Sequence, residues 1–283
     1  MIRGFCLMRF LAGCVVVGGM IFSHGKAAWA WEVGTEAGFD SNVNRSVHDE
    51  EDDWYVTGYA LYTWEPVQES RFTWNATVSV DGTAYEDFSD LNCAVATIAP
   101  GAVYRLGRIW DVGLSAFLEG KAVKDEDQSA LTLGAKVNLN RKWRRNRYIG
   151  AYYVFTDSHA EADTYSFTEH ALGGFLGVNW TPWSFGEIGY EFAHGDSFRA
   201  VDAETETSSG QGAGRHRARR RYSQAFGTDV IRESVHQHTI SADLGFDVTA
   251  SLFLWASYSF TTARGDLGTS TSCSGFLGIG YGF

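Results

Sequence analysis

Four histidines and one serine are the residues whose spacing could support bond-breaking chemistry. His170, His194, His236 and His238 share one face of runs in which apolar and polar residues alternate, and Ser234 lies two residues before His236 on that face. A serine beside a histidine could act as a nucleophile in a hydrolase, but the imidazole then needs a third group to orient it. No Asn or Asp is clearly placed for that role.

The same imidazoles have two other interpretations. They could bind a metal ion, although no helical or tight ligand spacing supports this. The simplest interpretation is that they are amphipathic residues at a membrane interface, where they would contact lipid headgroups. We therefore predict no enzyme, no catalytic residue, no metal and no cofactor, with a lipid hydrolase and a headgroup or metal site as alternatives.

Charged residues recur on the opposite face of the alternating runs. Acidic side chains outnumber basic ones there, and rings of one charge select ions of the other. We predict either a small cation-preferring channel or a site for a polar solute; the alternative is a plugged interior in which carboxylates pair with bases and water. The predicted inward-facing residues are Glu32, Glu36, Asp40, Asp81, Asp111, Glu119, Glu187, Glu191, Asp243 and Asp247, with the basic residues Arg71, Arg105, Lys121 and Lys136.

A long connection, residues 196–233, holds a basic segment preceded by a stretch rich in Gly and Ser. It could be a finger that docks lipopolysaccharide phosphates or an acidic polymer. It could also be a lid that folds into the acidic interior, or a solvated loop. The basic residues are Arg215, Arg217, Arg219, Arg220 and Arg221.

Strict alternation predicts the elements that position these residues. In the run from Arg71 to Asp81 every even-numbered residue is apolar and every odd-numbered residue is polar, as in a strand with one face in lipid. Each such run is long enough for a tilted transmembrane strand, which needs about 9–11 residues. The predicted strands are 31–40, 54–64, 71–83, 93–106, 110–121, 129–140, 147–157, 168–181, 184–195, 234–249, 252–264 and 273–283.

The connections between these runs alternate in length, as in outer-membrane barrels with short periplasmic turns and longer outer loops. The short ones are 65–70, 107–109, 141–146, 182–183 and 250–251, and the long ones are 41–53, 84–92, 122–128, 158–167, 196–233 and 265–272. We predict an all-β fold, a single antiparallel transmembrane β-barrel of about twelve strands. A spanning sheet must close because lipid cannot satisfy a free edge. A soluble barrel or sandwich of similar strand content is the alternative.

The first thirty residues are typical of a cleaved signal peptide. Arg3 and Arg9 precede an apolar run, residues 10–22, which is shorter than the roughly 20 residues of a transmembrane helix. Residues 28–30, Ala-Trp-Ala, fit a cleavage site. The expected organisation is a signal peptide, residues 1–30, and a barrel, residues 31–283, in the bacterial outer membrane with both termini periplasmic. A net charge of −11 argues against nucleic acid as a partner.

The end of the chain alternates as well. Leu277, Ile279, Tyr281 and Phe283 share one face of the last predicted strand. This pattern resembles the signal that the barrel-assembly machinery reads in outer-membrane proteins. The resemblance implies that machinery as a partner. We also expect outer-membrane lipids and lipopolysaccharide as partners, and the oligomeric state stays open.

A second resemblance rests on Asp40-Ser41-Asn42-Val43-Asn44-Arg45 and on the rhythm of residues 235–260. Both are similar to uncharacterised Gram-negative outer-membrane barrels, namely the barrel domain of surface lipoprotein assembly modifiers and barrels associated with exopolysaccharide loci. The resemblance implies a barrel layout and carries over no catalytic residue. The function we expect is a small porin-like or accessory channel for polar solutes, with a link to envelope polysaccharide traffic. A non-conducting structural or adhesive surface barrel and, more distantly, the lipid hydrolase are the alternatives.

Overall fold

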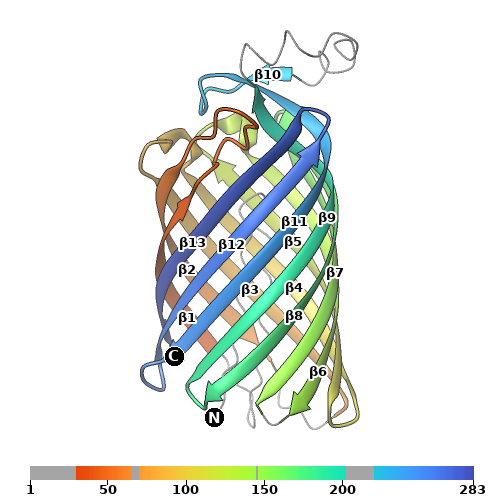
Figure 1. Ribbon diagram of the computed structural model, residues 1–283. Helices are drawn as coiled ribbons and strands as arrows, with labels where there is room; N and C mark the ends of the chain where they lie inside the picture. Colours follow the sequence, from red (N-terminus) through yellow and green to blue (C-terminus); the bar gives the residue numbers. More distant parts are fainter. Residues whose placement is uncertain (1–29, 66–69, 145, 202–219) are drawn as a thin grey trace.

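The computed structural model describes residues 30–65, 70–144, 146–201 and 220–283. These residues form one antiparallel barrel of tilted strands (Figure 1). The predicted signal peptide lies outside the described residues, apart from Ala30. Among the described residues no helix is long and apolar enough to cross a membrane.

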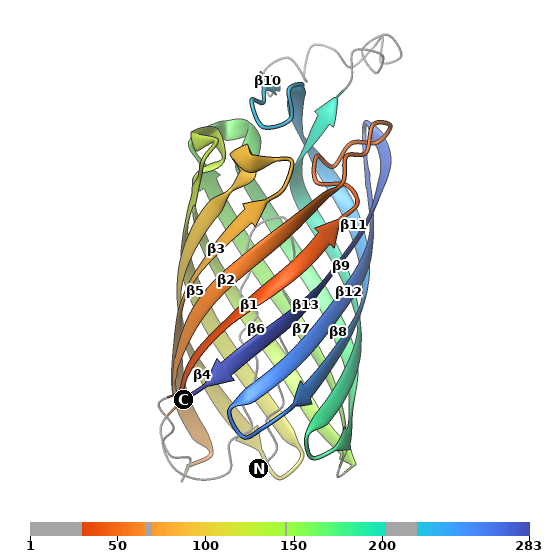
Figure 2. The same ribbon diagram turned by 90° about the vertical axis from the view of Figure 1, so that its left-hand side faces the viewer.

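The described strands make a thirteen-stranded sheet, of which β10 is only three residues long and the other twelve form the wall. β13 pairs with β1 and so closes the barrel, as Figure 2 shows. The predicted all-β fold and its twelve strands are therefore confirmed. The strands are β1 (Ala30–Asp40), β2 (Asp53–Trp64), β3 (Phe72–Tyr85), β4 (Cys93–Leu106), β5 (Trp110–Val123), β6 (Ala130–Arg144), β7 (Arg147–Ala160), β8 (Phe167–Thr181), β9 (Ser184–Val201), β10 (Arg220–Tyr222), β11 (Asp229–Asp247), β12 (Leu252–Gly265) and β13 (Gly268–Gly282).

The alternation of the sequence decides which face of each strand points outward. On β3, Trp74 is 61% exposed and Val80 is 52% exposed, whereas Thr73 and Ser79 on the other face are buried. The same holds around the barrel, so the outer face is a continuous apolar surface and the polar face points inward. An exterior of this kind is stable only in contact with lipid.

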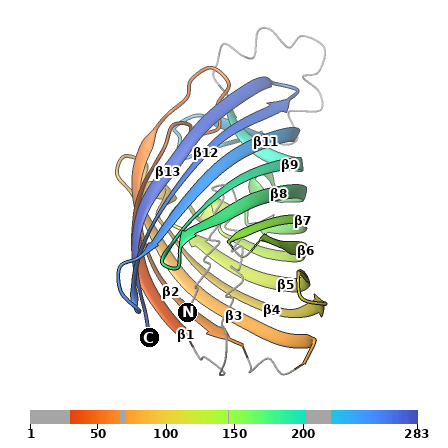
Figure 3. The same ribbon diagram turned by 60° about the horizontal axis from the view of Figure 1, so that its bottom comes forward.

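The two ends of the barrel differ. The terminal end, where β1 begins and β13 finishes, carries short turns such as residues 107–109 and 182–183 (Figure 3). The opposite end, called the loop end below, carries the other connections, including the 3-10 helices η1 (Ser89–Leu91), η2 (Glu126–Gln128) and η3 (Asp163–Tyr165). The alternation of short and longer connections matches the expected arrangement with one exception.

That exception is the last connection at the loop end. Residues 265–272 were expected to form a longer loop, but β12 continues to Gly265 and β13 begins at Gly268. The turn between them therefore has two residues, Asp266 and Leu267, and Gly268 takes a φ of +128°. Gly, Ser and Thr in this segment looked like loop residues, but they continue the ladder, with Ser270 buried.

The 196–233 connection is also shorter than expected. β9 runs on to Val201 and β11 begins at Asp229, and the two pair over the whole extension. The polar residues that suggested a loop stabilise it instead: the Arg232 guanidinium binds the Asp196 carboxylate across the two strands at 2.6 Å. Opposite charges on neighbouring strands favour pairing.

Aromatic rings on the inner wall lie over glycines of the neighbouring strand. Phe117 covers Gly134, and Trp255 covers Gly278; a Cβ at either glycine would overlap the ring. Glycine is therefore required there because the ring occupies the space above the backbone. Cys93 and Cys273 are both free.

Candidate functional site

The barrel interior holds a cavity of about 190 Å³ near the loop end, lined by both polar and apolar side chains. Hydroxyl groups from several strands line it, and they are hydrogen-bonded in pairs across the sheet. Thr132 and Ser158 lie 2.8 Å apart, and Ser259 and Ser274 lie 2.7 Å apart. Each hydroxyl can exchange its hydroxyl partner for a polar solute or a water molecule.

Carboxylates from β1 and β5 join this lining. Asp40 accepts a hydrogen bond of 2.8 Å from the Ser272 hydroxyl, and Glu119, only 1% exposed, accepts one of 3.3 Å from Thr97. Three further carboxylates accept bonds from inward-facing hydroxyls. The acceptor–donor pairs are Glu32–Tyr59 at 2.9 Å, Glu191–Tyr152 at 2.8 Å and Asp243–Ser257 at 2.7 Å.

The predicted inward-facing residues occupy the inner face of the wall with one exception. Arg71 precedes the first residue of β3 and is exposed, so it sits at the rim of the terminal end. Because β3 begins at Phe72, the assignment of Arg71 to the interior stays a prediction. Glu32, Glu36, Asp40, Asp111, Glu119, Glu187, Glu191 and Asp243 are buried, and Asp81, Arg105, Lys121, Lys136 and Asp247 are half-buried.

Two of the basic residues have visible partners. Arg105 lies 4.0 Å from Asp111 near the terminal end. The Lys136 ammonium lies 4.8 Å from the centre of the Tyr152 ring, an attractive cation–π contact.

The segment from Asp40 to Arg45, which carried the family resemblance, folds into the loop-end mouth. Asn42 donates to the Ser46 and Thr271 carbonyls, both at 2.9 Å, and ties the β1–β2 connection to β13. Arg45 adopts the left-handed φ of +53° and donates to Ser197 Oγ at 2.7 Å. Its guanidinium stacks on the Phe198 ring, and burial lowers the pKa of Arg45 to about 10.

Sequence reasoning missed a buried ion pair at this end. Arg199 on β9 and Glu233 on β11 are both 1% exposed, with Nε and Oε1 2.9 Å apart. Arg199 also donates to the Ala263 and Gly268 carbonyls at 2.8 Å and 3.1 Å, and Glu233 accepts from the Leu267 amide at 3.1 Å. We call this group the clasp; it joins β9 and β11 to the β12–β13 turn. Both residues belong to the 196–233 segment, which the sequence predicts as a connection, so the alternation of apolar and polar residues could not assign them to strands.

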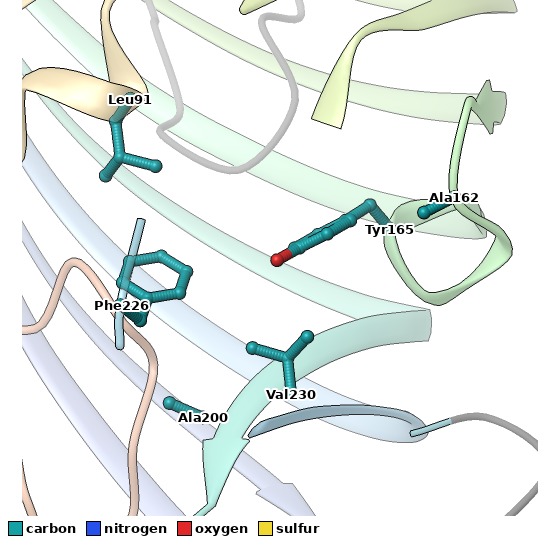
Figure 4. Close-up of a cluster of buried hydrophobic side chains, with 6 residues drawn as sticks. All are labelled: Leu91, Ala162, Tyr165, Ala200, Phe226 and Val230. Atoms are coloured by element: carbon teal, nitrogen blue, oxygen red, sulfur yellow. The ribbon is translucent and has the colours of Figure 1, made fainter. Parts of the chain in front are cut away.

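A hydrophobic cluster, called the mouth cluster below, packs at the loop end (Figure 4). Leu91 comes from η1, Tyr165 from η3, and Phe226 and Val230 from the connection into β11 and from β11 itself. Ala162 and Ala200 complete it. Its members come from segments far apart in the sequence, so the cluster holds the loop-end connections together.

The basic segment is described only in part. Arg215, Arg217 and Arg219 lie outside the described residues, and Arg220 begins β10. The Arg221 guanidinium binds the Asp127 carboxylate of η2 at 2.6 Å, with both side chains partly exposed. This contact joins β10 to a neighbouring loop-end connection; the finger and lid interpretations of the segment are not tested by it.

The four histidines are brought together on the outer face. His170, His194 and His236 are cross-strand neighbours on β8, β9 and β11. The rings of His194 and His236 stack with centroids 4.5 Å apart and planes 17° apart. Ser234 makes no hydrogen bond to an imidazole among the described residues, and that part of the chain contains no group of three or more His, Cys, Asp or Glu suited to a metal.

Comparison with known proteins identifies the class by fold. No protein-family model matches the sequence, and no curated protein matches it. The structure is similar to an outer-membrane channel from Pseudomonas putida F1, with 10% identity, a TM-score of 0.60, and coverage of 92% of this chain and 97% of that one. It is also similar to the KdgM porin in complex with disordered oligogalacturonate, with 9% identity, a TM-score of 0.50, and coverage of 89% and 99%.

The chain is thus a transmembrane β-barrel with the fold of bacterial outer-membrane channels. At these identities the likeness extends to the fold alone. The finer resemblance to assembly-modifier or exopolysaccharide barrels stays a prediction.

Proposed function

We propose that the barrel is a small porin-like channel for polar solutes. The observation that carries the proposal is the polar inner face, which encloses a hydroxyl-lined cavity of about 190 Å³ while the outer face is apolar. A structure built only to be stable in lipid could fill its interior with apolar side chains. Here the interior also offers hydrogen-bonding groups at several levels, beside apolar clusters around Phe117 and around Trp255.

The charge of the inner face favours cations. Carboxylates outnumber basic side chains on the inner positions of the strands, and two of the basic groups, Arg105 and Arg199, bind carboxylates. A negative lining lowers the energy of a cation in the pore and raises that of an anion. We therefore propose cation preference, with uncharged polar solutes also admitted.

Saccharides are one solute class that this lining suits. Paired Ser and Thr hydroxyls such as Thr132 and Ser158 can exchange hydrogen bonds with a sugar, and the inner wall adds aromatic rings such as Trp255. The porin of similar fold that was solved with oligogalacturonate gives a precedent at the level of fold only. Involvement in envelope polysaccharide traffic belongs to the same proposal.

Planar-bilayer recording of residues 31–283 tests the channel. In a KCl gradient we expect discrete conductance steps and a reversal potential that shows cation preference. Asp40→Asn should reduce that preference, because it removes a carboxylate from the cavity wall, whereas Glu161→Gln in the exposed β7–β8 connection should not. No conductance, or preference for anions, would overturn the proposal.

One observation favours a non-conducting structural barrel as the second candidate. The mouth cluster packs buried apolar side chains from distant connections across the loop end. If it stays closed under all conditions, the barrel would serve as a surface scaffold and no solute would pass.

A further inference from the structure

The outer face of the barrel carries a row of nitrogen donors across four neighbouring strands. His170 on β8, His194 on β9, His236 on β11 and Arg264 on β12 are successive cross-strand partners, and all four side chains are exposed. Neighbouring strands lie about 4.8 Å apart, so this row, called the imidazole row below, spans about 14 Å of the barrel surface. His238 flanks it on β11.

The imidazole row borders the apolar belt directly. On β8 the next outward residue toward the terminal end is Leu172, which is 60% exposed; on β11 His238 is followed by Ile240, which is 56% exposed. Lipid chains cover those apolar side chains, so the row lies at the depth of the headgroups. This depth is where a phosphorylated lipid presents its charge.

Hydrogen bonds to tyrosines orient two of the rings. Tyr153 Oη lies 2.7 Å from His170 Nδ1, and Tyr190 Oη lies 2.8 Å from His238 Nδ1. When the phenol donates to Nδ1, the neutral imidazole carries its proton on Nε2 and presents an N–H donor on its other edge. In that tautomer the rings are donors without needing a positive charge.

Two acids near the imidazole row, Asp157 and Asp196, are engaged by other groups. On β7, Asp157 accepts from the Thr168 hydroxyl at 2.8 Å and lies 3.8 Å from His159 Nδ1. On β9, Asp196 is bound by Arg232 at 2.6 Å. The chain has 34 acidic and 23 basic residues, but the row itself contains four donors and no carboxylate, so its charge complements an anion.

A single metal ion fits this arrangement less well. The stacked rings of His194 and His236 are nearly parallel, so the in-plane lone pairs of their nitrogens run side by side and do not converge on one point. Separate N–H donors spaced along a line suit the several oxygens of phosphate groups better.

We propose that the imidazole row is a docking site for the phosphate groups of lipopolysaccharide. Arg264 supplies the fixed positive charge, and the imidazoles supply additional donors at the headgroup level. The proposal needs the loop end to face the outer leaflet, and it is independent of whether the barrel conducts.

Native mass spectrometry of the folded barrel in detergent tests the site with diphosphorylated lipid A as the probe. Charge-assisted hydrogen bonds of this kind contribute enough that losing several should weaken binding about tenfold or more. We expect that loss in the triple variant His194→Asn, His236→Asn, Arg264→Gln. His48→Asn, an exposed histidine of the β1–β2 connection, is the matched control and should bind as the parent chain does.

Two lipid comparisons complete the test. The parent chain should bind dephosphorylated lipid A and phosphatidylglycerol at least about tenfold more weakly than the diphosphorylated lipid. Equal binding of dephosphorylated lipid A, equal binding of phosphatidylglycerol, or an unchanged triple variant would each overturn the proposal. When Arg264 is replaced by Lys and not by Gln in this triple variant, part of the affinity for lipid A should return, which would exclude a folding defect as the cause of the loss. The bilayer conductance of the triple variant should equal that of the parent chain.

Discussion

At the residue scale, the inner wall depends on contacts between rings and glycines. Phe117 on β5 lies over Gly134 on β6, where the two residues are cross-strand partners. The alternation of the sequence predicts that both residues face inward. It does not predict that they are partners, because the pairing register between strands is a property of the whole sheet.

Replacing this glycine should destabilise the barrel. In Gly134→Ala the new Cβ would overlap the Phe117 ring, which must rotate away from the wall, and overpacking of this kind costs about 1–3 kcal/mol. Gly120→Ala is the matched control, since that glycine faces outward on β5 with nothing within 4 Å. Thermal unfolding in detergent should show a lower midpoint for Gly134→Ala alone. Equal midpoints would show that the ring moves without cost.

At the element scale, the strands were predictable and their extensions at the loop end were not. Apolar and polar residues must alternate along a strand in the lipid layer, so the sequence pattern of such a strand is easy to recognise. Beyond the apolar belt, β9 and β11 are held by the Arg199–Glu233 clasp and the Asp196–Arg232 pair, which a periodicity of two cannot detect. The mouth cluster was missed for the same reason, because its members come from connections distant in the sequence.

Breaking the clasp should loosen the loop end. Arg199→Met leaves the Glu233 carboxylate buried without its cation, and removing one member of a buried pair costs about 3–5 kcal/mol. The double variant Arg199→Met, Glu233→Leu should recover much of this loss. The rate of backbone hydrogen exchange at the β12–β13 turn would measure how far each variant loosens the loop end. If the single and double variants exchange equally fast, the ion pair is not what secures the turn.

The last strand carries a prediction about assembly. Leu277 on the outer face of β13 is 70% exposed, and Phe283, directly after β13, is 71% exposed, so another protein could contact both before the barrel closes. We expect Phe283→Ser to slow insertion by the reconstituted barrel-assembly machinery severalfold. Val248→Ser, an equally outward position after β11, should insert at the normal rate. Normal insertion of Phe283→Ser would show that the machinery does not recognise the terminal aromatic residue.

At the scale of the whole molecule, we expect the mouth cluster and the polar interior to act in opposition. The interior could conduct, whereas Phe226 and its neighbours form a buried apolar cluster among the loop-end connections. Phe226→Ala removes a buried ring that contacts Phe88 and Phe198, so we expect larger or more frequent conductance steps in planar bilayers. Tyr222→Ala, an exposed ring of the same segment, should leave conductance unchanged. An unaltered Phe226→Ala channel would show that the cluster does not limit flow.

The orientation of the barrel connects the remaining inferences, since the expected route of export leaves both termini in the periplasm and the loop end outside. Two turns at opposite ends offer a direct test after Cys93 and Cys273 are replaced by Ser. Asp266→Cys lies in the β12–β13 turn at the loop end, and Ala250→Cys lies in the β11–β12 turn at the terminal end.

Both sites are exposed, so they differ only in the side of the membrane that they reach. A membrane-impermeant maleimide applied to intact cells should label Asp266→Cys and spare Ala250→Cys, and both should react once the outer membrane is permeabilised. The reverse pattern would place the imidazole row in the inner leaflet, where lipopolysaccharide is absent, and would leave the polar interior and its cation preference unaffected.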